Sequence, residues 1–91
     1  MKSVVTVVNN KSGLHARPAA MFSAKAKTFA SIITVRNVDE DTDAVNAKSM
    51  LKVLTLGIVQ GTNIELRASG EDETAAIAEL NNMIAEGFGE K

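Results

Sequence analysis

The chain has 91 residues, of which 45% are hydrophobic and 23% charged, and its 10 basic and 11 acidic side chains give a formal net charge of −1. This length suffices for one hydrophobic core, so residues 1–91 are predicted to form a single domain. The near-neutral charge argues against a nucleic-acid partner, and the absence of cysteine excludes thiolate chemistry. The single histidine has no carboxylates at metal-ligand spacing around it, so no metal site is predicted. The sequence also lacks a phosphate-binding glycine loop, so no nucleotide or other cofactor is expected. Without a signal-peptide pattern or a run of roughly 20 apolar residues, we expect a cytoplasmic protein that does not insert into a membrane.

The first half of the chain alternates strand and helix patterns. Residues 4–8 are β-branched and predict a strand, but both of its faces are apolar, so the pattern does not say which face is buried. A turn over 9–13 leads to a helix predicted at about 16–28, with Pro18 in its first turn. Its apolar residues recur at helical spacing: Ala19, Phe22, Ala26 and Phe29. Residues 32–38 predict a second strand.

The second half begins with an acidic turn over 39–43 and a short return strand over 44–46. A short helix is predicted over 50–56, entered through Ser49 and ended by Gly57. A turn over 61–63, a half-buried strand over 64–68, and a last helix that opens at 69–73 and ends at Gly87 complete the chain. The buried stripe predicted for the last helix is Ile77, Leu80 and Ile84. The order βαββαβα predicts an α+β, open-faced β-sandwich in which a four-stranded sheet, antiparallel or mixed, carries helices on one face.

The only histidine, His15, lies between a glycine-containing turn and the first turn of a helix. The amides of Ala16 and Arg17 have no acceptor within such a helix, so a phosphate on the imidazole would meet free N–H donors and the positive end of the helix dipole. The guanidinium of Arg17 can bind two phosphate oxygens at once. The same dipole favours a neutral imidazole, which keeps the lone pair that a nucleophile needs. Taken alone, a histidine at a helix start is more often a cap or a surface residue than a functional one.

The segment 13–20, GLHARPAA, resembles the active-site motif of the histidine-containing phosphocarrier (HPr) family of the bacterial phosphotransferase system. Residues 47–57, AKSMLKVLTLG, resemble the second signature of that family. Residues 60–62 and 68–73 are similar to its fourth strand and to the start of its final helix. The similarity covers nearly the whole chain, and it implies an HPr-like fold with the predicted βαββαβα order.

The resemblance implies a phosphoryl carrier that is not itself an enzyme. His15 would accept a phosphoryl group on Nδ1 from Enzyme I, itself charged by phosphoenolpyruvate, and would pass it to the IIA domains of sugar permeases. Arg17 would orient the phosphate. Support of the phosphate and its loop is expected from Ser12, Gly13, Ala16 and Pro18. For Ser12, the role of a plain turn residue is equally open.

Partner proteins are expected to bind an apolar surface beside His15. Its expected members are Leu14, Ala20, Ser49, Met50, Leu51 and Leu54, with Lys27 and Lys52 as a basic rim, while Val53 and Leu56 are predicted to be core. Ser49 is well placed to cap the short helix, and it also stands where some family members carry a phosphoserine made by a serine kinase. Members known for that regulation have glycine where this chain has Lys52, which favours the cap.

Two other functions remain open at this point. One is a regulatory relative from the nitrogen-related phosphotransfer branch, and the other is a binding module of the same fold whose His15 is never phosphorylated. A small hydrolase is disfavoured because the sequence offers no second polarised group. The acidic hairpin over 38–46 looks longer than is common in the family and is expected to lie away from His15. A monomer is expected.

Overall fold

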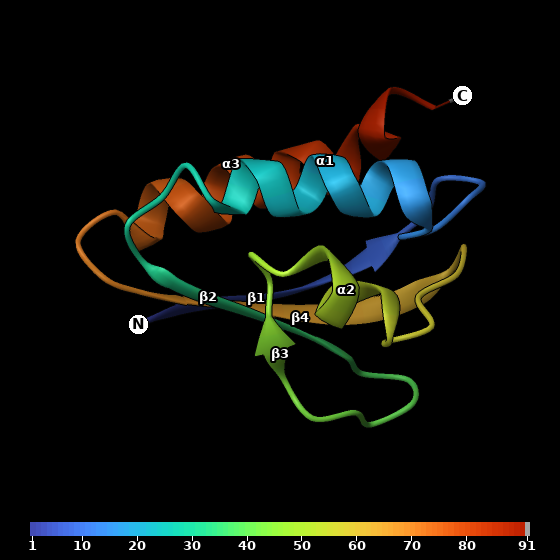
Figure 1. The fold of residues 1–91 in the computed structure, drawn as a ribbon, viewed down its shortest axis with the longest axis horizontal. Coiled ribbons are helices and arrows are strands. Elements are labelled where there is room, and N and C mark those ends of the chain that lie inside the picture. Colours follow the sequence, from blue (N-terminus) through green and yellow to red (C-terminus); the bar gives the residue numbers. More distant parts are fainter. Residues whose placement is uncertain (91) are drawn as a thin grey trace.

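The computed structural model describes residues 1–90, so the predicted domain 1–91 extends one residue beyond the described part. Figure 1 shows one layer of helices above one sheet. The four strands are β1 (Lys2–Val8), β2 (Ile32–Asn37), β3 (Val45–Asn46) and β4 (Thr62–Ser69), in the spatial order β1-β4-β2-β3. All three strand pairs are antiparallel. The predicted α+β open-faced sandwich with a four-stranded sheet is confirmed.

Side chains alternate across the sheet, and this alternation decides which face of each strand is buried. In β4 the residues Thr62, Ile64, Leu66 and Ala68 are buried, and the residues between them are exposed or half-buried. The structure also settles the face of β1: Val8 is buried with Val4 and Thr6 half-buried beside it, whereas Val5 is 58% exposed. The open face of the sheet therefore carries apolar side chains at its β1 edge.

The helices are α1 (Ala16–Ala26), α2 (Met50–Leu54) and α3 (Glu73–Ala85), followed by the short 3₁₀ turn η1 (Gly87–Gly89). Figure 1 shows α1 and α3 side by side over one face of the sheet, while α2 packs against α1. The predicted stripe of α1 is buried in full, and Phe29, in the turn after the helix, belongs to the same core. Within residues 1–90, no helix has the length and apolar character to cross a bilayer.

Several predicted boundaries were wrong by a few residues, each for a physical reason. The helix predicted to residue 28 ends at Ala26, because Thr28 and Phe29 bond back to carbonyls three residues earlier, as in a turn. The same tightening at Thr55 and Leu56 ends α2 at Leu54. The turn predicted over 61–63 is wrong beyond Gly61, since Thr62 and Asn63 pair with Val8 and Val7 and already belong to β4. The strands predicted at 32–38 and 44–46 are each one residue shorter.

The buried stripe of α3 also differs by one position from its prediction. Ala76, Leu80 and Ile84 are buried, whereas Ile77 is only half-buried against the core. The helix begins at Glu73, the last residue of the predicted opening over 69–73, and its N-cap residue Asp72 accepts hydrogen bonds from the backbone amides of Ala30 (2.8 Å) and Ser31 (2.9 Å). The hydroxyl of Ser31 also donates to this carboxylate, which lowers the pKa of Asp72 most strongly. Asp72 thereby fixes the start of α3 to the turn before β2.

Candidate functional site

His15 is the N-cap residue of α1, with an extended backbone (φ −83°, ψ −166°), and its side chain makes no capping hydrogen bond. The residue is exposed. The first helical hydrogen bond runs from the Ala19 amide to the His15 carbonyl (2.8 Å), so the amides of Ala16 and Arg17 have no acceptor within the helix. The predicted combination of an accessible imidazole and helix-start donors is therefore present.

The loop before His15 is held by two backbone hydrogen bonds. The Gly13 amide donates to the Asn10 carbonyl (3.1 Å), and the Leu14 amide donates to the Ile58 carbonyl (3.0 Å). Gly13 has φ +62°, and a Cβ built there would lie 2.5 Å from the Ile58 carbonyl oxygen and 2.7 Å from Val59 Cα. Only glycine fits this approach. The segment around Ile58 is thus a support of the His15 loop that sequence reasoning missed, because the two segments are far apart in the chain.

A shallow hollow of about 320 Å³ lies beside the imidazole. It is lined by Ser12, Leu14, His15, Ala16, Leu54, Gly57, Ile58 and Val59. Ser12 and His15 therefore line the same hollow. Ala16 of α1 and Leu54 of α2 also line it, so the hollow lies between these two helices.

Leu14 was predicted wrongly as an exposed member of the partner surface. It is only 3% exposed and belongs to the core. The chain is extended at this point, so successive side chains point to opposite sides. With His15 directed outward, Leu14 is directed inward.

Ser12 is bound to a residue that the sequence did not single out, Glu90. The Ser12 hydroxyl donates to Glu90 Oε2 (2.5 Å), and the Ser12 amide donates to Glu90 Oε1 (3.2 Å). The side-chain amide of Asn10 donates to Glu90 Oε1 (3.2 Å) and to the Gly13 carbonyl (2.9 Å). These contacts, led by the Ser12 hydroxyl and joined by the charge of Arg17, lower the pKa of Glu90. Both the amide and the hydroxyl of Ser12 therefore already donate to Glu90.

The other predicted surface residues are accessible to differing degrees. Leu51 is 78% exposed, Met50 and Leu54 are half-buried, and Val53 and Leu56 are core, as predicted. Of the remaining predicted site residues, Arg17, Ala20, Lys27 and Lys52 are exposed, whereas Pro18 and Gly13 are buried. The predicted docking surface, called the docking surface below, is therefore reduced to Ala20, Ser49, Met50, Leu51 and Leu54, with Lys27 and Lys52.

Ser49 caps α2, as expected. It is the N-cap residue, and its hydroxyl oxygen accepts a hydrogen bond from the Lys52 amide (3.3 Å). An oxygen acceptor at this position satisfies one of the unpaired amides of the helix start. The contact accounts for serine at this position without any modification.

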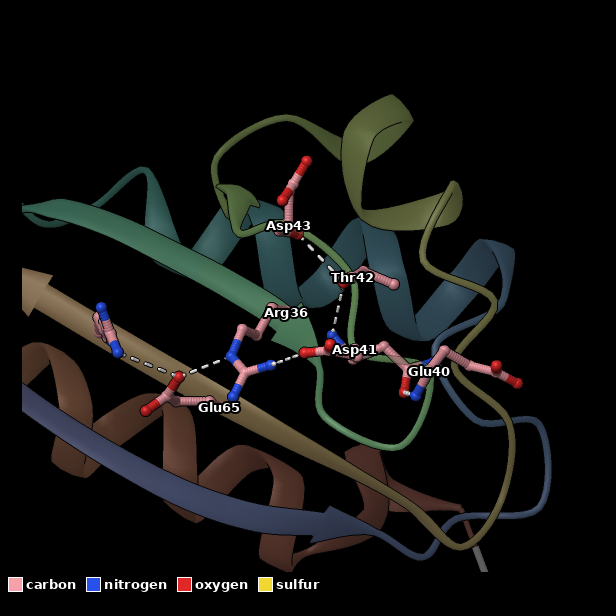
Figure 2. A network of polar contacts seen from close by, with 8 residues as sticks. Arg36, Glu40, Asp41, Thr42, Asp43 and Glu65 are labelled. Atoms are coloured by element: carbon pink, nitrogen blue, oxygen red, sulfur yellow. Dashed lines mark hydrogen bonds and ion pairs between the residues drawn. The ribbon is translucent and has the colours of Figure 1, made fainter.

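The acidic hairpin between β2 and β3 is fixed to the open side of the sheet, as Figure 2 shows. Arg36 Nε donates to Glu65 Oε1 (2.8 Å), and Arg36 Nη1 lies 3.4 Å from Asp41 Oδ1. The hydrogen bond from Arg36 lowers the pKa of Glu65. Asp39 accepts hydrogen bonds from the backbone (2.9 Å) and side chain (3.1 Å) of Asn63. In Figure 1 this loop lies below α2, whereas α1, whose N-cap residue is His15, lies above the sheet.

Among residues 1–90, no three histidine, aspartate or glutamate side chains are grouped so that they could hold a metal ion.

Comparison with known proteins gives consistent matches. A family profile described as "PTS HPr component phosphorylation site" matches residues 2–86. The phosphocarrier protein HPr of Buchnera aphidicola is 47% identical over 74 residues, which cover 81% of this chain and 84% of that protein. Multiphosphoryl transfer proteins also match, for example that of Vibrio cholerae at 46% identity over 91% of this chain. The chain spans only about a fifth of the length of these larger relatives, 17–22%.

Solved structures agree with the fold. A crystal structure of HPr from Thermoanaerobacter tengcongensis superimposes with a TM-score of 0.94 at 45% identity, covering 100% of this chain and 99% of that chain. A crystal structure of an HPr dimer from the same organism gives 0.77 at 46% identity, covering 99% and 100%.

Proposed function

The chain belongs to the HPr family, and from this premise we propose that it carries a phosphoryl group on His15 from Enzyme I to the IIA domains of sugar permeases. The observation that carries the proposal is the state of His15: an exposed imidazole at the start of α1 with no capping hydrogen bond to give up. A carrier needs a nucleophile that proteins can reach, and it needs no enclosed substrate pocket of its own.

The transfer itself follows from the donors around the imidazole. The lone pair of Nδ1 attacks phosphorus, the new N–P bond forms, and the bond from phosphorus to Enzyme I breaks with its electron pair left on Enzyme I. The amides of Ala16 and Arg17 and the guanidinium of Arg17 would bind the phosphoryl oxygens. Gly13, Pro18 and Ser12 would support these groups by fixing the loop and the first turn. The transfer to a IIA domain repeats the step with the roles exchanged.

The docking surface supports the choice of proteins as substrates. It places an almost fully exposed leucine, Leu51, and a flexible methionine, Met50, on α2, which packs against the helix that begins at His15. Lys27 and Lys52 add positive charge, which speeds encounter with acidic partner surfaces. We propose that one domain acts as a monomeric cytoplasmic carrier that is regenerated in each cycle and converts no substrate of its own.

The proposal is tested by labelling. Purified protein is incubated with Enzyme I and phosphoenolpyruvate that carries labelled phosphorus. We expect about one phosphoryl group per chain, in a linkage that acid hydrolyses and base preserves, followed by loss of the label when a IIA domain is added. If the protein takes up no label from a competent Enzyme I, the proposal is contradicted. The remaining function would then be a binding module of the same fold whose His15 is not phosphorylated. If the protein is labelled but passes its phosphoryl group only to regulatory IIA domains, it belongs to the nitrogen-related branch.

Replacing Arg17 with alanine is expected to slow phosphoryl transfer from Enzyme I by about ten- to a hundredfold, because a hydrogen bond to a charged group contributes about 1.5–3 kcal/mol. Arg17 is exposed, so the free energy of unfolding should change by less than about 0.5 kcal/mol. Rapid-quench kinetics and urea denaturation measure the two quantities. Arg17→Lys keeps the charge without the planar pair of donors and should recover part of the rate. An unchanged rate in Arg17→Ala would remove Arg17 from the mechanism.

Replacing Leu51 with alanine is expected to raise the KM for phospho-Enzyme I about fivefold or more with little change in kcat, because a docking contact is made equally before and during transfer. Stability should be unaffected, since the side chain is 78% exposed. Ile32→Ala is the matched control, because Ile32 is 73% exposed but lies on β2. If both variants behave like the wild type in steady-state kinetics, α2 is not the docking element.

A further inference from the structure

The side chain of Asn10 is buried in the loop that leads to His15. It is only 5% exposed, although asparagine is mostly found at protein surfaces. Its side-chain amide donates to the Gly13 carbonyl (2.9 Å), and the Gly13 amide donates back to the Asn10 carbonyl (3.1 Å). Two hydrogen bonds thus run in opposite directions between the same two residues. They close the turn over 10–13, which ends two residues before His15.

Gly13 is therefore held by two segments at once. A Cβ built on Gly13 would lie 2.5 Å from the Ile58 carbonyl oxygen, so this part of the loop is in close contact with the segment around Ile58. Asn10 binds both polar groups of the Gly13 backbone. Only one residue separates Gly13 from His15, so the place of the imidazole relative to the first amides of α1 depends on this turn.

The orientation of the Asn10 side chain is fixed, because both of its partners are acceptors. They are the Gly13 carbonyl and the Glu90 carboxylate, whose Oε1 lies 3.2 Å from Asn10 Nδ2. A rotated amide would place its oxygen against two other oxygens. Within residues 1–90, Asn10 Oδ1 is buried and has no hydrogen-bond partner. A buried acceptor without a partner costs stability, and such departures from stable packing are concentrated at functional sites.

We propose that Asn10 is a positioning residue for phosphoryl transfer: its side-chain amide holds the turn over 10–13, and through it His15, in the geometry that the reaction requires. This inference rests on the proposed carrier function. Asn10 is buried and does not belong to the docking surface, so its effect falls on the transfer step and not on the binding of Enzyme I. A displacement of reacting groups by about 1 Å can slow a reaction by up to about a hundredfold.

The test compares Asn10→Ala and Asn10→Asp with the wild type in rapid-quench kinetics at varied concentrations of phospho-Enzyme I. We expect kcat to fall about tenfold in Asn10→Ala, with KM unchanged within about twofold. Asn10→Asp keeps the shape of the side chain but replaces its donating nitrogen with an acceptor oxygen, so its kcat should fall further.

Asn9→Ala and Asn9→Asp are the matched controls. Asn9 carries the same side chain one residue earlier, but it is exposed, and its contact with the Gln60 side chain (3.0 Å) uses the Asn9 backbone carbonyl. Asn9→Asp also introduces the same negative charge as Asn10→Asp. Both control variants should transfer the phosphoryl group like the wild type.

Thermal unfolding separates positioning from stabilisation. Asn10→Ala loses two hydrogen bonds but also removes the unpaired oxygen, and these changes oppose one another, so Tm should fall by less than about 8 °C. The kinetics are measured well below the melting transition, where the variant is folded. A residue that only stabilised the fold would leave kcat of the folded protein unchanged.

Nuclear magnetic resonance of the phosphorylated protein gives an independent readout. Phosphorylation of the wild type should move the amide proton resonances of Ala16 and Arg17 downfield, because these amides bind the phosphoryl oxygens. The shift should be smaller in Asn10→Ala and unchanged in Asn9→Ala.

Three results would overturn the inference while the carrier function stands: a wild-type kcat in Asn10→Ala, a loss confined to KM, or an equal loss of kcat in Asn9→Asp and Asn10→Asp. The last would assign the effect to charge instead of to the turn. A wild type that accepts no phosphoryl group from a competent Enzyme I would refute the carrier function and, with it, the role of Asn10 in transfer.

Discussion

His15→Ala is expected to lose all acid-labile phosphoryl label while the fold stays intact. His15 is the only histidine in the chain, so no second imidazole can take over the reaction. Its side chain makes no capping hydrogen bond and is exposed, so its removal should change the free energy of unfolding by less than about 0.5 kcal/mol. Labelling with Enzyme I and phosphoenolpyruvate measures the first quantity, and urea denaturation measures the second.

The chemistry of any remaining label provides the control for this experiment. A phosphoryl group on a serine is stable in acid, whereas one on a histidine nitrogen is not. Label that persists in His15→Ala and survives acid would therefore report a serine or threonine hydroxyl, and it would leave the assignment of His15 intact. Acid-labile label that persists in the variant would contradict that assignment.

Gly13→Ala is expected to be the most destabilising change in the loop and to impair phosphoryl acceptance as well. A residue with a side chain at φ +62° costs about 1–2 kcal/mol. The new Cβ would also lie 2.5 Å from the Ile58 carbonyl oxygen and 2.7 Å from Val59 Cα, both backbone atoms that cannot rotate away. Overpacking of this kind adds about 1–3 kcal/mol. The loop has to move, and His15 follows it two residues later.

Gly57→Ala is a close control for this prediction. Gly57 has the same φ of +62°, and a Cβ built there meets nothing within 4 Å. It should therefore show the cost of the backbone conformation alone, about 1–2 kcal/mol. The difference between the two variants in urea denaturation isolates the contact between Gly13 and Ile58. Equal stabilities would mean that the segment around Ile58 adapts easily and does not fix the loop.

The sequence predicted the element order because each element has a clear local period. The alternation in β4 and the helical stripe of α1 depend only on neighbours in the chain, so they can be recognised without knowing the fold. The boundaries were less certain, because Thr62 is held in its strand by Val8, more than half the chain away. The same holds for the start of α3, where Asp72 binds the amide of Ser31.

The candidate site could be predicted only in its local part. His15, Arg17 and Ser49 stand in motifs whose residues are close in sequence, and the structure finds them at the helix starts expected for them. Leu14 was placed incorrectly because it was assigned to the surface from its position next to His15 in the sequence. Neighbouring residues of an extended segment can point to opposite sides, and Leu14 is buried. Glu90 was missed because its contact with Ser12 joins residues 78 positions apart, and no spacing rule connects them.

The position of β4 in the centre of the sheet has a consequence for how the protein folds. β1 and β2 both hydrogen-bond to β4 and not to one another, although β4 is the last strand in the chain. Neither earlier strand has its principal partner until residues 62–69 have left the ribosome, so the sheet cannot assemble progressively during synthesis. Closing the long loop between β1 and β4 costs chain entropy before any contact compensates for it. Until then the valine-rich β1 strand is unpaired, which makes this interval the one in which the protein is most exposed to aggregation.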